Sequence, residues 1–137
     1  MAVVEELLRS EAGGAISFGN HKLAQKAKME DFRHQGDLLK VKTYSEITKL
    51  EKNGMFLYES VPGTSVLNFT EKENGVEFTV EGDEDAQITV GLTDGKAYEV
   101  FVDGESHGAI KTGFGGKLSV GVELETAGEV AVKIVQI

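Results

Sequence analysis

Few side chains in this 137-residue chain have the types and spacing that catalysis requires. The chain has no cysteine, and its histidines, His21, His34 and His107, lie far apart and outside any H-E-x-x-H pattern. Nucleophilic catalysis needs a hydroxyl or thiol beside a positioned base. His107 follows a turn signal and the other two stand among polar residues, so all three are predicted to face solvent.

Acidic residues crowd one stretch, which contains Glu77, Glu81 and the run Asp83-Glu84-Asp85. A pair of carboxylates can cleave a glycosidic bond, but the acid needs burial or a like-charged neighbour to raise its pKa. Because these glutamates alternate with core residues on a predicted strand, we expect them to be solvated. The run 83–85 lacks the ligand spacing of an EF-hand loop. We interpret it as an acidic loop and leave a loose calcium site as the alternative.

The glycine-rich segment Gly113-Phe114-Gly115-Gly116-Lys117 does not fit a phosphate-binding loop. Lys111 stands where the motif needs its first glycine, and Leu118 replaces the hydroxyl residue. A turn between strands is expected, with Phe114 tucked onto the sheet or, alternatively, exposed as a contact residue. The sequence therefore predicts no catalytic, cofactor-binding or metal-binding residue, and the interpretation leans away from an enzyme.

The net charge of −9 belongs to one half of the chain. Residues 1–69 hold nine acidic and nine basic side chains, whereas residues 70–137 hold 14 acidic and five basic ones. An acidic chain is a poor match for the phosphates of nucleic acid, which we exclude as a partner. No apolar run is long enough to span a membrane. The first residues lack the basic and apolar regions of a signal peptide, so a cytoplasmic location is expected.

The N-terminal third gives mixed signals. Apolar residues recur at helical spacing from Ala2 to Ala12, which predicts a short amphipathic helix that Gly13-Gly14 ends. Residues 15–18 are predicted as a short strand. The conformation of residues 19–37 is left open, with extended structure slightly favoured.

From Leu38 onward the chain has the pattern of short strands separated by glycine turns. Asn-Gly and Asp-Gly pairs, the strongest hairpin signals, stand at positions 53–54, 74–75, 94–95 and 103–104. Such spacing predicts a mainly β fold, a sandwich or small barrel. One domain over residues 1–137 is favoured, and the alternative is a β-rich part over 1–64 followed by a second unit over 65–137.

Two segments resemble known proteins. The stretch YEVFVDGESHGAIKTGFGGKLSVGVEL, residues 98–124, resembles Ig-like β-sandwich modules that accompany extracellular carbohydrate-active enzymes in bacteria. This resemblance implies that the C-terminal half is an Ig-like sandwich.

A second resemblance covers nearly the whole chain. MAVVEELLRSE, SFGNHKL and VKTYSEITKLEKNGMFLYESVPGTSVLNF, together with the segment above, are similar to a family of small clostridial proteins that are sometimes labelled endosialidase. The label implies action on polysialic acid. Such sites grip carboxylates with arginines, and this chain has only Arg9 and Arg33, so no catalytic residue is carried over.

Three functions are consistent with these observations. The favoured one is a non-enzymatic protein with a structural, assembly or partner-binding role, in the form of a homo-oligomer or with a protein partner. The alternative is a carbohydrate-binding or glycan-processing accessory protein that recognises sialylated glycans. The third is an enzyme that uses the acidic cluster, with or without calcium.

Overall fold

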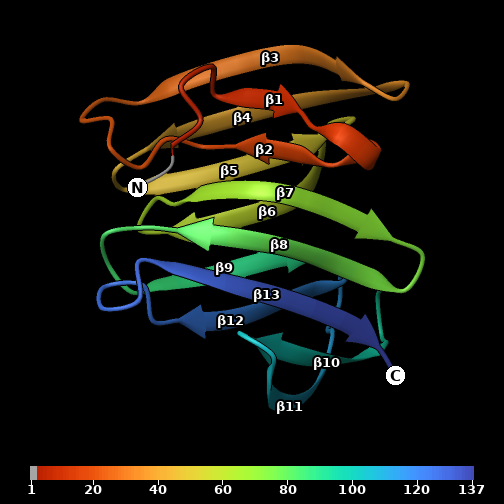
Figure 1. Ribbon diagram of the computed structural model, residues 1–137. Helices are drawn as coiled ribbons and strands as arrows, with labels where there is room; N and C mark the ends of the chain where they lie inside the picture. Colours follow the sequence, from red (N-terminus) through yellow and green to blue (C-terminus); the bar gives the residue numbers. More distant parts are fainter. Residues whose placement is uncertain (1–2) are drawn as a thin grey trace.

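The computed structural model describes residues 3–137, which form 13 strands in two antiparallel sheets. The predicted mainly β fold is confirmed. Figure 1 shows the two sheets stacked face to face as a sandwich. The seven-stranded sheet has the order β1 (Leu8–Ser10), β2 (Ile16–Phe18), β7 (Ser65–Lys72), β8 (Gly75–Glu81), β13 (Glu129–Gln136), β10 (Ala97–Val102) and β11 (Glu105–Lys111).

The second sheet has six strands and lies behind the first in Figure 1. Its order is β12 (Lys117–Val122), β9 (Ala86–Gly91), β6 (Met55–Val61), β5 (Ile47–Lys52), β4 (Asp37–Tyr44) and β3 (Ala27–His34). Strands from both halves of the sequence take part in each sheet. Among residues 3–137, no helix is long and apolar enough to cross a membrane.

Two of the four predicted hairpin turns, at 53–54 and 103–104, lie where the sequence places them. The turn before β8 lies one residue earlier, at 73–74, because Lys72 pairs with Gly75, and Asp94-Gly95 joins two strands that belong to different sheets. Asn53 and Gly54 join β5 to β6 with φ angles of 52° and 79°, and Asp103 and Gly104 join β10 to β11 with 52° and 81°. Positive φ at both positions matches the twist of the flanking strands. For residues 19–37 the sequence slightly favours extended structure, and the strand over residues 27–34 agrees with this preference.

The predicted N-terminal helix is wrong. Residues 1 and 2 lie outside the described part, and the rest of the segment forms β1 and a single 3₁₀ turn, η1 (Ala12–Gly14). Val4 and Leu8 are buried, and the Val4 amide donates to the carbonyl of Gly19. A helix of three turns is marginal by itself. Pairing with β2 satisfies the backbone and buries the same apolar side chains, so tertiary contacts override the helical spacing.

The interior between the sheets is aromatic. Phe18, Phe69 and Phe78 from the seven-stranded sheet surround Tyr58 from the six-stranded sheet, with ring centroids 5.2 to 6.2 Å from that of Tyr58. Edge-to-face packing of this kind adds about 0.5–1.5 kcal/mol per pair beyond the area buried. The cluster fixes how the two sheets face each other.

A layer of hydroxyl groups lies at one end of this core. Thr48 Oγ1 donates to the Thr64 carbonyl at 2.7 Å and accepts from the Thr64 amide at 3.1 Å and from the Thr43 hydroxyl at 2.8 Å. Thr64 Oγ1 in turn contacts Tyr58 Oη at 2.8 Å and Ser60 Oγ at 2.7 Å. All five side chains are fully buried, and burial raises the pKa of Tyr58 far above its ordinary value of 10.

Candidate functional site

A groove of about 670 Å³ lies on the outward face of the seven-stranded sheet. Two rows of side chains cross the strands there. One row pairs Thr70, Glu77, Lys133 and Phe101, and the other passes through Thr79 and Ala131. Cross-strand neighbours of this kind lie about 5 Å apart on one face. The groove exists because the short side chain of Ala131 stands between longer ones.

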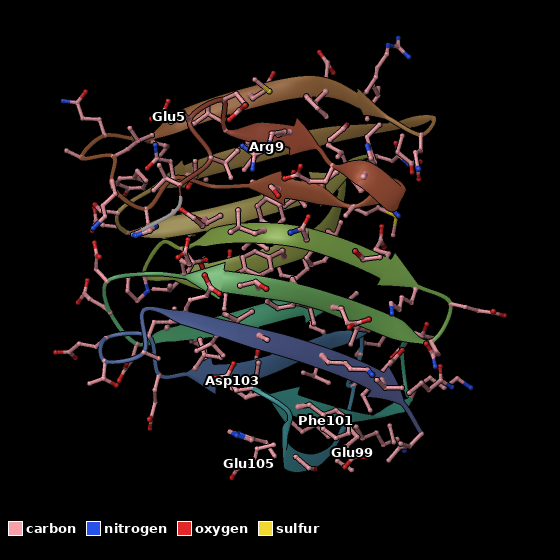
Figure 2. All side chains as sticks on the ribbon, viewed as in Figure 1. Glu5, Arg9, Glu99, Phe101, Asp103 and Glu105 are labelled. Carbon is pink, nitrogen blue, oxygen red and sulfur yellow. The ribbon has the colours of Figure 1, made fainter. Side chains whose placement is uncertain are left out.

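One end of the groove is acidic. Phe101 is half-buried on β10, and Figure 2 shows it with Glu99, Asp103 and Glu105 at the end of the sheet formed by β10 and β11. Asp103 accepts the Ala131 amide with Oδ1 at 2.8 Å, so the turn after β10 is tied to the groove floor. Glu99 accepts a hydrogen bond from Ser106 at 2.7 Å.

The opposite wall of the groove is an ion pair. Lys72 Nζ contacts Glu77 Oε2, and this hydrogen bond, with the charge of Lys133 behind it, lowers the pKa of Glu77. Glu77 therefore stays ionised near neutral pH. It is half-buried rather than freely solvated, because Lys72 on β7 contacts it and Lys133 lies directly opposite it on β13.

Phe114 is the most exposed large apolar side chain of the described residues, at 102 % of its reference area. The prediction that favoured a ring tucked onto the sheet is wrong. Space around Gly113 and Gly115 is open, since a Cβ at either position would meet nothing within 4 Å. The ring therefore projects from the turn between β11 and β12 without touching the sheet.

The base of this turn is held firmly. The buried Thr112 hydroxyl donates to the Thr93 carbonyl at 2.6 Å, and the Leu92 amide donates to the Gly116 carbonyl at 2.8 Å. Gly116 has φ 73°, and a Cβ there would lie 2.1 Å from the Leu92 carbonyl oxygen, so only glycine fits. The firmly held base limits the space that the tip of the turn can reach, which lowers the entropy lost when a partner binds.

His21 is buried at 4 % exposure, so the prediction of a solvent-facing side chain is wrong. Its Nδ1 lies 2.7 Å from Ser65 Oγ, which also accepts the His21 amide at 3.3 Å. The contacts are satisfied when the Ser65 hydroxyl donates to Nδ1, which leaves the imidazole proton on Nε2. That atom faces Asp83 Oδ1 at 3.8 Å. Burial lowers the pKa of His21, and the Asp83 carboxylate opposes this only in part.

Serine, histidine and aspartate stand together here, but they form a structural contact. Ser65 has no exposed surface, so no substrate can reach its hydroxyl. Asp83 binds Lys22 Nζ at 2.7 Å, and this hydrogen bond lowers the pKa of the Asp83 carboxyl. The contacts clamp the loop after β8 onto the loop before β3. Sequence reasoning missed the cluster because its members are 44 and 61 residues apart in the chain.

The other candidates of the sequence are scattered. His34 is half-buried and contacts Ser10 Oγ at 2.9 Å, whereas His107 is exposed, as predicted. Glu81 is buried at 6 % exposure, so its predicted solvation is wrong; loops of the sandwich close over the end of β8. Asp85 Oδ1 accepts the Glu125 amide at 3.0 Å. Among residues 3–137, no three acidic or histidine side chains are placed to hold a metal ion together.

No protein family, curated protein or solved structure matches the chain.

Proposed function

We propose that this chain is a non-enzymatic β-sandwich protein that binds further copies of itself, with Phe114 of one copy entering the groove of the next. The observation that carries the proposal is the pairing of a projecting aromatic ring with a hollow it can fill. The Phe114 ring is fully exposed, and the hollow above Ala131 is walled by Phe101.

The energetics favour such a contact. A phenylalanine ring gains about 1.5–3 kcal/mol when its apolar surface leaves water, and the outward-facing side chains of the groove offer the Phe101 ring and the methyl group of Ala131 to receive it. An exposed aromatic residue on a rigid turn is typical of the central anchor of a protein interface. The contact therefore has an anchor and a pocket.

Charge supports the same pairing. Phe114 is flanked by the exposed Lys111 and Lys117, whereas Glu99 and Asp103 lie next to Phe101 on β10 and its turn. Complementary charges of this kind set the orientation and speed of association more than its strength.

The geometry of the contact is head-to-tail, because ring and groove lie on different surfaces of the same chain. A head-to-tail contact generates a ring if the rotation closes and a filament if it does not. Edge strands β11 and β12 lie near the turn and have one unpaired side within the described sheets. Burying them would remove backbone groups that otherwise invite unspecific pairing.

Two variants and their mixture test the proposal by light scattering after gel filtration. Phe114→Ser removes the anchor, and Ala131→Arg fills the groove. We expect the unaltered chain to exceed the 14.8 kDa of one chain as concentration rises, and each variant to be monomeric. An equimolar mixture should form a dimer, because it contains one intact ring and one intact groove.

Matched controls distinguish this specific contact from nonspecific hydrophobic association. Met55→Ser removes another exposed apolar side chain, and Ala24→Arg places the same arginine on the exposed loop between β2 and β3, away from the groove and from the turn that carries Phe114. Both should assemble like the unaltered chain. A protein that stays monomeric at high concentration, or variants that assemble unchanged, would refute the proposal.

A second function, carbohydrate binding, is favoured by one observation. The half-buried Phe101 ring lies in the groove beside the hydroxyls of Thr70 and Thr79 and the amide of Asn68, which are groups that bind sugars. The resemblance to Ig-like modules and to proteins labelled endosialidase supports it. A glycan array that includes sialylated chains tests it. Binding should be lost in Phe101→Ala and kept in Phe56→Ala, and an array without any signal rejects it.

A further inference from the structure

A second hollow, of about 210 Å³, lies on the outward face of the six-stranded sheet, away from the groove. It spans β3, β4 and β5. Its lining consists of four lysines and one acidic residue, namely Lys28, Lys40, Lys42, Lys49 and Glu51. We call it the lysine pocket. In a chain of net charge −9, such a concentration of positive charge needs a physical reason.

The strand register places three of these lysines in one row. Lys28 lies directly opposite Lys42, and Lys42 lies directly opposite Lys49. Side chains in such positions are about 5 Å apart at Cβ, and like charges there destabilise the sheet. The row thus has an energetic cost in the free protein, which an anion between the ammonium groups would relieve.

The neighbouring carboxylates neutralise the row only at its margins. Lys40 contacts Glu30 at 3.6 Å, with both side chains about half exposed. Glu51 lies opposite Lys40, and Glu59 lies opposite Lys49 on β6. Within residues 3–137, Lys28, Lys42 and Lys49 make no ion pair. The excess positive charge is therefore centred on Lys28 and Lys42.

We propose that the lysine pocket binds a tetrahedral oxyanion, a phosphate or sulfate group, through Lys28, Lys42 and Lys49. Ammonium groups act as compact point charges with three donors each, and they suit a tetrahedral anion better than the planar carboxylate that arginine grips in two places. The pocket is several times the ~30 Å³ that one water occupies in the liquid, so it holds such a group with part of its hydration shell.

The lysine pocket is independent of the groove. None of its residues lines the groove, and the two hollows open on opposite outward faces of the sandwich. A failure of self-association through Phe114 leaves the anion site untouched, and the reverse also holds.

An NMR titration tests the proposal. Backbone amide signals of the full chain are followed during addition of inorganic phosphate and of pyrophosphate, with ionic strength held constant by chloride because salt screens exposed charges. We expect saturable shifts confined to β3, β4 and β5, and tighter binding of pyrophosphate. Lys42→Gln should weaken binding at least tenfold, whereas Lys96→Gln, which changes an exposed lysine of the β9–β10 turn, should leave it unchanged.

A third probe distinguishes the sources of the anion. Sulfated dextran, a polymer, should bind more than tenfold tighter than pyrophosphate if the group is carried on a chain, and equally or more weakly if the pocket takes the free ion. Absence of saturable shifts with all three probes overturns the proposal. Equal binding by the Lys42→Gln and unaltered proteins overturns it as well, since the shifts would then arise elsewhere.

Discussion

Replacing Thr48 by valine removes one hydroxyl from the buried polar layer and keeps the β-branched shape. The hydroxyl makes three hydrogen bonds, two with the backbone of Thr64 and one with Thr43. Each contributes about 1 kcal/mol net, which gives a loss of about 3 kcal/mol. The figure rises if the amide and carbonyl of Thr64 find no other partner, because unsatisfied buried groups cost about 1–3 kcal/mol each.

A loss of this size is a large part of the 5–15 kcal/mol that holds a typical domain together. The free energy of unfolding, measured by urea titration with equal m-values, should fall by about 3 kcal/mol. The melting temperature should fall by about 10 °C for a chain of this length. Thr89→Val is the matched control, since Thr89 bonds Ser119 on an exposed surface, and surface changes stay within about 0.5 kcal/mol. A loss below about 1 kcal/mol, or one equal to the control, would refute the view that the layer holds the loop at Thr64 to the sheet.

Three further outcomes follow from the structure. Burial lowers the pKa of His21 below its ordinary value of 6.5, so the unfolded chain takes up this proton at a higher pH than the folded chain does. Stability should therefore fall as the pH drops through about 6.5, and urea titrations should show less pH dependence in His21→Gln. Gly63→Ala should abolish folding in circular dichroism, since its Cβ would lie 1.9 Å from the carbonyl oxygen that ends β4, and a cooperative melt near that of the unaltered chain would contradict this. Lys42→Glu replaces two repulsive cross-strand pairs by attractive ones and should raise the free energy of unfolding by about 0.4–2 kcal/mol at low salt, with the gain vanishing at high salt.

The turns and most strands could be predicted because their determinants are local. An Asn-Gly or Asp-Gly pair requires positive φ within two residues, so the hairpin at Asn53-Gly54 needs no information from elsewhere. Alternation along β8 and β12 indicates the buried face for the same reason. In contrast, the spacing of Val4 and Leu8 fits either a helix face or a docked segment, and only the presence of β2 decides between them.

The candidate sites could not be predicted, since they depend on pairs of strands far apart in the sequence. The groove needs β8 beside β13 and β13 beside β10, so that Ala131 stands between Thr79 and the turn at Asp103. The burial of His21 needs Ser65 and Asp83, which lie more than 40 residues further along the chain. Of these sites, the lysine row comes closest to being predictable from the sequence, because Lys42 and Lys49 lie in one hairpin whose register is fixed by its turn. Lys28 joins them only through residues 19–37, whose conformation the sequence leaves ambiguous.

The place of β13 has a consequence for the order in which the molecule forms. Strands β3 to β6 pair with their sequence neighbours and can form early, since short loops close quickly. The hairpin β10–β11 is different, because it joins the rest of its sheet only through β13, which inserts between β8 and β10. We expect this insertion to be the slow step of folding. Until it occurs, the edges of β8 and β10 stay open and the chain is most prone to aggregate.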